Sequence, residues 1–358
     1  MIPLLCALLL AQTPPAKTQW MLETENKGPY QGDLFFRVTL KGLDIREWAI
    51  FLPKAPDLGP GIQTEVETTA LIVGSNAKPV AVRDFSPLQR TIYTLRLPTQ
   101  AQANKEMFEI RVKYKANLFM RKLAPLSEGA QPAKPVPPLK EAEKALYLSE
   151  WGDIKFKEKT FQEWLDNNEC RMKPAETEID FARRVFLHLH YKMDFDVSPT
   201  MDRRSTAVVS SMRSDGGGIS NVYVAILRAN KIPSRSLWGR WMLPGKEPLK
   251  RNNVAFNFMG VKTEFFAPGV GWVPADPGSA LFEKKKVEPG LFFGMEQVPF
   301  LAQHVDPTVD VMNPVTKKRI QMTGLQLPGY WALAPAGPTS TPEFFQEWKA
   351  TQPTKSSP

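Results

Sequence analysis

The first third of the chain alternates apolar and polar residues in the way that β-strands do. In FEIRVKYKA, the residues Phe108, Ile110, Val112 and Tyr114 share one face, and mostly charged residues occupy the other. This period of two predicts a strand with one buried face. Four more runs, DLFFRVTL, WAIFL, TALIV and TIYTLRL, are rich in branched and aromatic residues and are separated by turn residues. We therefore predict an antiparallel β-sandwich over residues 20–123.

Further along the chain the apolar positions recur at helical spacing. In AETEIDFARRVFLHLHY they are Ile179, Ala182, Phe186 and Leu189. A second helix is predicted over residues 219–227, where apolar residues fall at i, i+3, i+4, i+7 and i+8. The runs SLWGRWM, TEFFA and GWVPA then read as strands. Helices followed by strands that pack on them favour an α+β domain over residues 146–335.

Three segments lie outside these two domains. Residues 124–145 carry five prolines and are predicted to form a stiff linker. Residues 336–358, rich in Pro, Ser, Thr and Lys, are predicted to be a flexible tail. Residues 1–11 hold an apolar run that is too short to span a bilayer and resembles a signal peptide, although no Lys or Arg precedes it. We expect a periplasmic or secreted protein; the alternative is a frayed apolar N-terminus.

The chain is basic, but its charged residues are not concentrated in one segment. There are 46 Lys+Arg residues against 37 Asp+Glu, which gives a net charge of +9 spread along the whole length. Solvated basic faces account for this pattern, and a patch for an anionic surface is the sharper alternative. No DNA- or RNA-binding motif is present, so we expect no nucleic-acid partner. Nothing after residue 11 is long and apolar enough for a transmembrane segment.

Cysteine chemistry is limited by number. The 358 residues contain only Cys6 and Cys170, and Cys6 belongs to the predicted signal peptide. An exported chain would keep Cys170 alone, so no intramolecular disulfide could form. A zinc site built on cysteines is excluded for the same reason. We expect no metal and no cofactor.

Three consecutive glycines stand directly before the second predicted helix, in SDGGGIS. Glycine inside a helix costs roughly 1 kcal/mol relative to alanine, so this stretch needs an explanation. Asp215, just before the glycines, is well placed to cap the helix and to favour its dipole. A second interpretation is an anion site, in which the bare backbone N–H groups of residues 216–218 bind a carboxylate. No Lys-Ser or Lys-Thr pair follows, so a phosphate-binding P-loop is excluded.

SDGGGISNVYVAILRANKIPSRSLWGRW, followed by GVKTEFFAPGVGWVPADP, resembles the transglutaminase-like domain of bacterial exported proteins. The resemblance covers about residues 146–335 and implies a papain-like fold. Such domains often follow a β-sandwich, which agrees with the pattern of the first third. The residues that match stand in the family's order; they are Leu227-Arg228-Ala229, Ile232-Pro233-Ser234-Arg235, Glu264, Gly271 to Pro274, and Asp276-Pro277.

The resemblance also implies a catalytic triad of a Cys nucleophile, a His base and an Asp that orients the His. Carried over by position, the Cys falls on Gly216 and the His on Gly260, and only the Asp is kept, as Asp276. Glycine supplies neither nucleophile nor base, and a triad acts as a unit. The resemblance therefore implies a degenerate site with no acyl transfer. We expect these three positions to cluster at one cleft, with Asp215, Gly217 and Gly218 as further binding residues.

Other residues offer a nucleophile or a base in principle. Cys170 could act with a histidine, but His188 and His190 lie about 200° apart on their helix and do not converge. A buried or half-exposed thiol is the simpler interpretation of Cys170. His304 could be a base brought in by the fold, although a structural histidine is simpler. Ser214 and Ser220 flank the glycines and lack a base.

The sequence thus favours an inactive transglutaminase-like protein that binds a peptide or glycan, or acts as a scaffold, in the cell envelope. Its partner would be an exported peptide, a protein or a cell-wall fragment. Two alternatives stay open: an active cysteine protease or transglutaminase that uses Cys170, and an interaction protein that works through its basic surface or β-sandwich.

Overall fold

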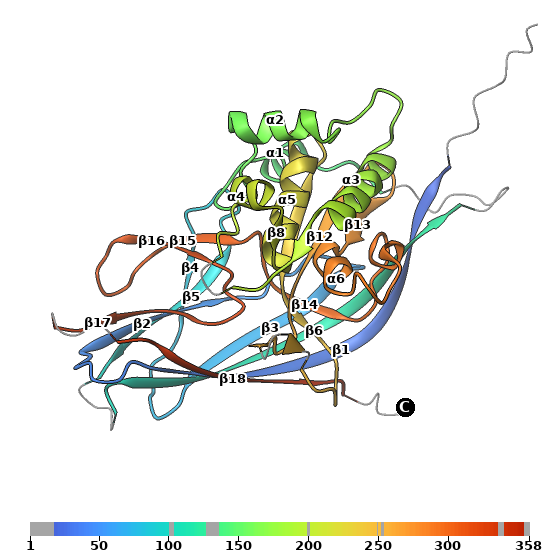
Figure 1. The fold of residues 1–358 in the computed structure, drawn as a ribbon. Coiled ribbons are helices and arrows are strands. Elements are labelled where there is room, and N and C mark those ends of the chain that lie inside the picture. Colours follow the sequence, from blue (N-terminus) through green and yellow to red (C-terminus); the bar gives the residue numbers. More distant parts are fainter. Residues whose placement is uncertain are drawn as a thin grey trace, which may run out of the picture.

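The computed structural model describes residues 18–99, 104–126, 136–198, 201–248, 250–251, 254–335 and 340–353. The fold is α+β, with antiparallel sheets in the N-terminal part followed by a region that carries the helices (Figure 1). This is the predicted fold class. The predicted signal peptide, residues 1–11, lies outside the described residues.

Six strands come first along the chain, three helices follow, and strands and helices are mixed after them. The strands are β1 (Trp20–Thr39), β2 (Glu47–Pro53), β3 (Gln63–Ile72), β4 (Val80–Arg83), β5 (Thr91–Pro98), β6 (Met107–Pro125), β7 (Asp194–Phe195), β8 (Arg213–Ser214), β9 (Ser234–Trp241), β10 (Lys250–Arg251), β11 (Val254–Ala255), β12 (Met259–Ala267), β13 (Gly271–Ala275), β14 (Phe300–Val305), β15 (Thr308–Met312), β16 (Arg319–Thr323), β17 (Gly329–Leu333) and β18 (Glu343–Thr351). The helices are α1 (Glu141–Leu146), α2 (Lys159–Asn167), α3 (Glu178–Lys192), α4 (Ser205–Ser211), α5 (Gly216–Ala229), α6 (Pro277–Phe282) and the 3₁₀ helix η1 (Pro289–Phe292).

Two four-stranded antiparallel sheets form the first lobe, in the orders β18-β1-β6-β3 and β17-β2-β5-β4. Every second side chain along β6 from Phe108 to Leu118 is buried, as the alternation predicts. The two sheets share one hydrophobic core, in which Trp48 of β2 packs edge-on against Phe108 of β6 with ring centroids 4.9 Å apart. This lobe is the predicted sandwich, with one difference in its strands.

The difference is that each sheet is completed by a strand from the C-terminal part. β17 pairs with β2, and β18 pairs with β1 from Thr39↔Glu343 to Gln31↔Thr351 (Figure 1). The prediction of a flexible tail over residues 336–358 is therefore wrong for residues 343–351. Unpaired strand edges leave backbone donors and acceptors that another strand can satisfy. Trp348 of β18 is 6 % exposed and lies so close that a Cβ on Gly32 would be 2.1 Å from its indole.

The predicted linker, residues 124–145, is ordered at both ends. Ala124 and Pro125 still belong to β6, where they pair with Met21 and Trp20. Residues 141–146 form the short helix α1. Residues 124–125 and 141–145 of the predicted linker therefore belong to β6 and α1.

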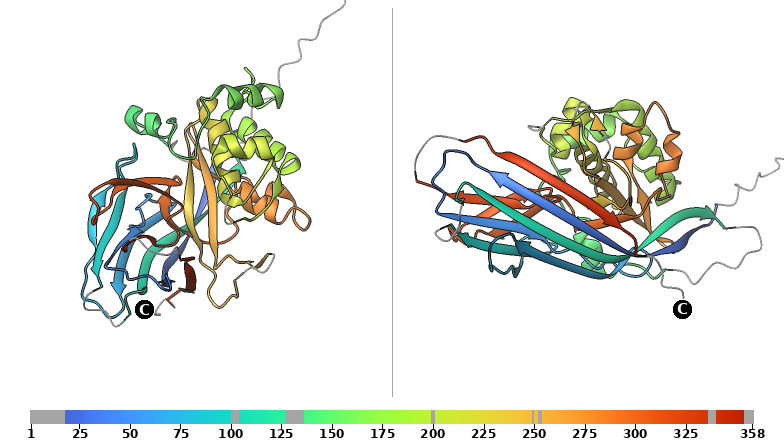
Figure 2. Two further views of the ribbon diagram at one scale, coloured as in Figure 1. Left: turned by 60° about the vertical axis from the view of Figure 1, so that its left-hand side comes forward. Right: turned by 90° about the horizontal axis from the view of Figure 1, so that it is seen from below.

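The second lobe is built on the sheet β13-β12-β9-β14. Helix α5 packs on β12 and β9, and α3, α4 and α6 contact α5 in turn. Residues 217–228 of α5 are all buried, which makes it the central helix of this lobe. Figure 2 shows the sheet between these helices and the β-sandwich. No helix of the described ranges is long and apolar enough to cross a membrane.

A buried ionic cluster joins the two lobes. Arg121 of β6 binds Glu264 of β12 and Glu296, with its Nη2 2.8 Å from Glu296 Oε1. Arg235 of β9 donates from Nε to Glu264 Oε2 at 2.8 Å, and Lys262 binds Glu296. Burial would raise the pKa of Glu264, but Arg121 and Arg235 outweigh it and hold the pKa below its usual value. The family-like residues Arg235 and Glu264 thus hold β12 and the lobe interface in place.

Candidate binding cleft

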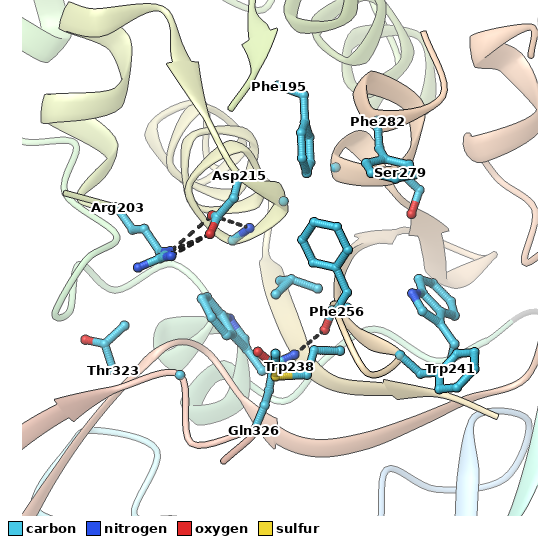
Figure 3. A pocket seen from close by; sticks show the side chains of 18 of the residues that line it. Phe195, Arg203, Asp215, Trp238, Trp241, Phe256, Ser279, Phe282, Thr323 and Gln326 are labelled. Carbon is cyan, nitrogen blue, oxygen red and sulfur yellow. Dashed lines mark hydrogen bonds and ion pairs between the residues drawn. The ribbon is translucent and has the colours of Figure 1, made fainter. Parts of the chain in front are cut away.

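A cavity of about 340 Å³ opens at the N-terminus of α5 (Figure 3). The wall is formed by the start of α5, the adjacent parts of β9 and β12, helix α6, the loop before β12, β7, the segment before α4, and the end of β16 with the segment that follows it. The residues that line it are Phe195, Arg203, Asp215, Gly216, Gly217, Trp238, Trp241, Leu243, Phe256, Phe258, Met259, Gly260, Val261, Gly278, Ser279, Phe282, Thr323, Gly324 and Gln326.

Asp215 is the N-cap of α5. Its Oδ1 accepts hydrogen bonds from the N–H groups of Gly217 at 3.0 Å and Gly218 at 3.2 Å. Arg203 pairs with the same carboxylate, with Nη2 2.6 Å from Oδ2 (Figure 3). The predicted cap is confirmed. The donors of Gly217 and Gly218 are thereby used within the chain, so they do not form the anion site of the second interpretation.

Gly216 and Gly218 have different surroundings. A Cβ on Gly216 would meet only the Cα of Gly278, at an ordinary contact distance of 3.7 Å. A Cβ on Gly218 would lie 2.0 Å from Ser214 Oγ, and Gly218 does not line the cavity. Position 216 therefore has room for a side chain at the cavity, whereas position 218 needs glycine for packing.

Gly260 faces the same cavity, but its side-chain space is taken. A Cβ on Gly260 would lie 2.5 Å from Nε1 of Trp241, well inside any contact that real Cβ atoms make. Trp241 is fixed at the end of β9, where its backbone N–H donates to Phe258 O. Its ring packs edge-on against Phe300. A tryptophan indole thus stands where the family resemblance places the base.

Asp276 lies next to this cavity rather than on its wall. Its carboxylate caps α6 by accepting the Ser279 N–H at 2.8 Å. It lines a second cavity of about 170 Å³, which shares Trp241, Leu243, Ser279 and Phe282 with the first. Burial raises the pKa of Asp276 to about 6, against the hydrogen bonds from Ser279. Gly216 and Gly260 therefore share one cavity, and Asp276 faces the adjoining one.

The alternative nucleophile and bases line neither cavity, although the ring of His304 stacks behind the wall on Trp238 with centroids 5.9 Å apart. Cys170 is buried in the core of the second lobe, its Sγ lies 3.5 Å from Asn168 O, and burial raises its pKa to about 12. His304 is bound through Nδ1 to Asp306 O at 2.9 Å, and burial lowers its pKa to about 3. His188 and His190 project from α3 and line neither cavity. Within the described wall residues, no Cys or His lines either cavity.

Sequence reasoning missed several residues of the cleft. Trp238 and Trp241 belong to the predicted strand SLWGRWM. Two tryptophans in a strand that follows the candidate site so closely in sequence could have indicated an aromatic wall. Gln326 had no signal: its Nε2 donates to Gly239 O at 2.8 Å and Gly260 O at 2.6 Å, and so ties the far segment to β9 and β12. Within the parts of the chain that the structure describes, no three His, Cys, Asp or Glu side chains group as metal ligands would.

Residues 168–277 match the family model of the transglutaminase-like superfamily. The matched segment begins after α2 and includes α3, α5, β9, β12 and β13, and hence both glycine positions. This part of the chain is therefore similar to a transglutaminase-like domain. No curated protein matches the chain.

Among solved structures, the fold is similar to that of a "putative cysteine protease" from Cytophaga hutchinsonii. The TM-score is 0.56 at 8 % sequence identity, over 94 % of this chain and 95 % of that one. The periplasmic domain of TgpA from Pseudomonas aeruginosa also matches, with a TM-score of 0.34 at 13 % identity, over 72 % of this chain and 91 % of that one. At these identities the first likeness shows the fold alone, and the second score is too low to support an argument.

Proposed function

We propose that the chain is a catalytically inactive transglutaminase-like protein that binds its partner at the cleft between α5, β9 and β12. It acts as a binding or scaffolding module in the cell envelope, in the periplasm or outside the cell. Its partner is an exported peptide, a protein or a cell-wall fragment. The observation that carries this proposal is the indole of Trp241 in the side-chain space of Gly260.

The chemistry of the cleft supports inactivity. A covalent acyl transfer needs a nucleophile that a nearby base can activate, and both groups are replaced by glycine. A histidine could not be accommodated at position 260 while Trp241 keeps its place. Because the indole of Trp241 occupies the space at position 260, this side of the cleft is an aromatic wall, which suits binding.

An active enzyme that uses Cys170 is the competing proposal. A thiol whose pKa is about 12 is a thiol and not a thiolate at neutral pH, and this one is 1 % exposed in a hydrophobic core. No histidine of the cleft wall is available to it among the described residues. This competing proposal requires the core around Cys170 to open.

The turnover assay decides between the two. Purified protein is incubated with a dansylated glutamine peptide and an amine donor, and separately with a casein substrate, beside its Cys170→Ser variant. We expect no transamidation, deamidation or proteolysis above the buffer blank from either protein. Turnover that Cys170→Ser abolishes would overturn the proposal.

Binding through the basic surface is the second competitor. Attraction between exposed charges falls steeply with salt, because the screening length shortens from about 10 Å at 0.1 M to about 3 Å at 1 M. Binding at the cleft should survive 1 M NaCl and respond to a bulky side chain at position 216. Binding that is lost in salt and unaffected by that side chain belongs to the surface.

A further inference from the structure

We propose that the larger cavity takes a large apolar side chain, preferentially aromatic, of an extended polypeptide. This inference rests on the proposed binding function and specifies its ligand. It excludes a glycan as the occupant of this cavity.

Aromatic side chains dominate the wall. They come from four different parts of the chain and surround the opening at the start of α5 (Figure 3). Trp238 and Trp241 flank the β9 side, and Phe258 and Val261 are each no more than 8 % exposed. Apolar walls of this kind gain free energy from the apolar area they bury. The aromatic members are Phe195, Trp238, Trp241, Phe256, Phe258 and Phe282.

The polar groups of the wall are mostly engaged within the chain. Asp215 is bound to Arg203 and to two backbone N–H groups, and the Gln326 amide donates to two backbone carbonyls. A sugar ring brings several hydroxyl groups, and each hydroxyl that loses water without a new partner is costly. The cavity therefore discriminates against hydroxyl-rich ligands.

Charge further restricts the chemical class of the ligand group that the cavity can take. Aromatic cages can bind ammonium groups through the faces of their rings. Here the one carboxylate among the wall residues, that of Asp215, is already paired with Arg203, so a cation would find no free counter-charge. A neutral apolar side chain fits both the rings and the charge.

Size and neighbourhood favour a polymer with side chains. A cavity of about 150 Å³ holds a benzene molecule, so about 340 Å³ takes an aromatic side chain with room for its attachment. The second cavity of about 170 Å³ adjoins it across Trp241 and Ser279 and can receive a smaller group of the same ligand. Arg203 carries five N–H donors and gives Asp215 those on Nε and Nη2, which leaves donors suited to a main-chain carbonyl.

The experiment uses the full chain with 5-fluorotryptophan in place of tryptophan. The ¹⁹F resonances of Trp238 and Trp241 are assigned from the Trp238→Phe and Trp241→Phe variants. The probes are the capped pentapeptides Gly-Gly-Phe-Gly-Gly and Gly-Gly-Ala-Gly-Gly, N,N′-diacetylchitobiose and toluene. We expect the phenylalanine peptide to shift both resonances and to bind at least about tenfold more tightly than the alanine peptide.

Two variants locate the binding. Gly216→Leu places a side chain in the cavity where the backbone has room, and should weaken the phenylalanine peptide at least about tenfold. Gly290→Leu is the matched control, because position 290 is exposed and has nothing within 4 Å of a Cβ. Circular dichroism melting checks that both variants fold. If a variant does not fold, the resonance shifts measured with the unsubstituted cavity still test the inference.

The outcomes separate this inference from the proposed function. Chitobiose that shifts both resonances and displaces the peptide overturns the ligand class but keeps a binding cleft. If toluene binds and neither peptide does, the claim that the ligand is a polypeptide is overturned. If no probe shifts either resonance, the inference fails, whereas inactivity is judged independently by the turnover assay.

Discussion

Glycine stands at both positions where the family resemblance places a nucleophile and a base, 216 and 260, yet the surroundings of the two glycines are opposite. At Gly216 an added Cβ would make one ordinary contact, with the backbone of Gly278. At Gly260 it would collide with the indole of Trp241. The nucleophile side of the cleft is therefore open, and the base side is filled. Restoring a side chain is simple at the first position and requires rebuilding a wall at the second.

The comparison extends along β12. Gly260 lies near the start of the strand, and Glu264 lies four residues later in the buried ionic cluster. The strand is thus fixed by charges at one point and by aromatic packing at the other.

The largest effect is expected from Glu264→Ala. This change leaves Arg121 and Arg235 buried with one carboxylate fewer, and breaking a buried ion pair costs about 3–5 kcal/mol. Urea unfolding followed by far-UV circular dichroism measures the loss. Glu67→Ala removes one side of the exposed pair with Lys115 and should cost no more than about 1 kcal/mol. Equal losses in the two variants would mean that the cluster does not hold β12.

Asp276 provides a test that depends on pH. Its pKa of about 6 in the folded state exceeds the usual value of about 3.9, so the folded state binds the proton more tightly. Its contribution to stability is complete below about pH 4 and is lost as the pH rises through about 6. Asp276→Asn should therefore gain about 2–3 kcal/mol over wild type between pH 4 and pH 7.5, measured by urea unfolding.

The control for this experiment is Asp44→Asn, which changes an exposed carboxylate whose ion-pair partner, Lys105, is also exposed. Its stability difference from wild type should stay nearly constant over the same range. A flat profile for Asp276→Asn would show that this carboxyl is solvated, and that the adjoining cavity is open to water.

Gly260→His tests the filled side directly. The imidazole must displace Trp241, and overpacking of this kind costs about 1–3 kcal/mol. Trp241→Ala in the same chain should recover part of the loss, because it vacates the space. Gly290→His is the surface control and should change the unfolding free energy little. A Gly260→His protein as stable as wild type would show that Trp241 moves aside readily.

Gly216→Cys should have the smallest effect on stability, within about 0.5 kcal/mol, because the position has room. In a Cys6→Ser background the new thiol should react with iodoacetamide in the folded state, while buried Cys170 should not. We expect no turnover from this variant, since no base accompanies the thiol. Labelling at Cys170 under native conditions would contradict its placement in the core.

Much of this architecture could be predicted from local patterns. The strand alternation of β6 and the helical spacing of α5 follow from the period of their apolar residues, and the Asp215 cap follows from its place before a helix. The two glycine positions came from a resemblance in motif order. What local patterns cannot give is the identity of side chains that meet from different elements. Trp241 reaches position 260 from a neighbouring strand, and Gln326 reaches it from the segment before β17.

The C-terminal strands were missed for a related reason. EFFQEWKAT lies in a region whose prolines and serines suggest disorder, and a single edge strand has no partner within its own stretch of sequence. This segment forms a strand because it pairs with the edge of β1 and because Trp348 packs over Gly32. Such pairing depends on the completed sandwich and is invisible to composition.

The pairing of β18 with β1 also has a kinetic consequence. The first described strand acquires its edge partner only when the last described strand has emerged from the ribosome, so the sandwich cannot close during synthesis of the residues between them. Contacts this distant in the chain make folding slow, because a very large loop must be closed first. Until then β1 presents an unpaired edge, and that interval is when the chain is most open to chaperones and to aggregation.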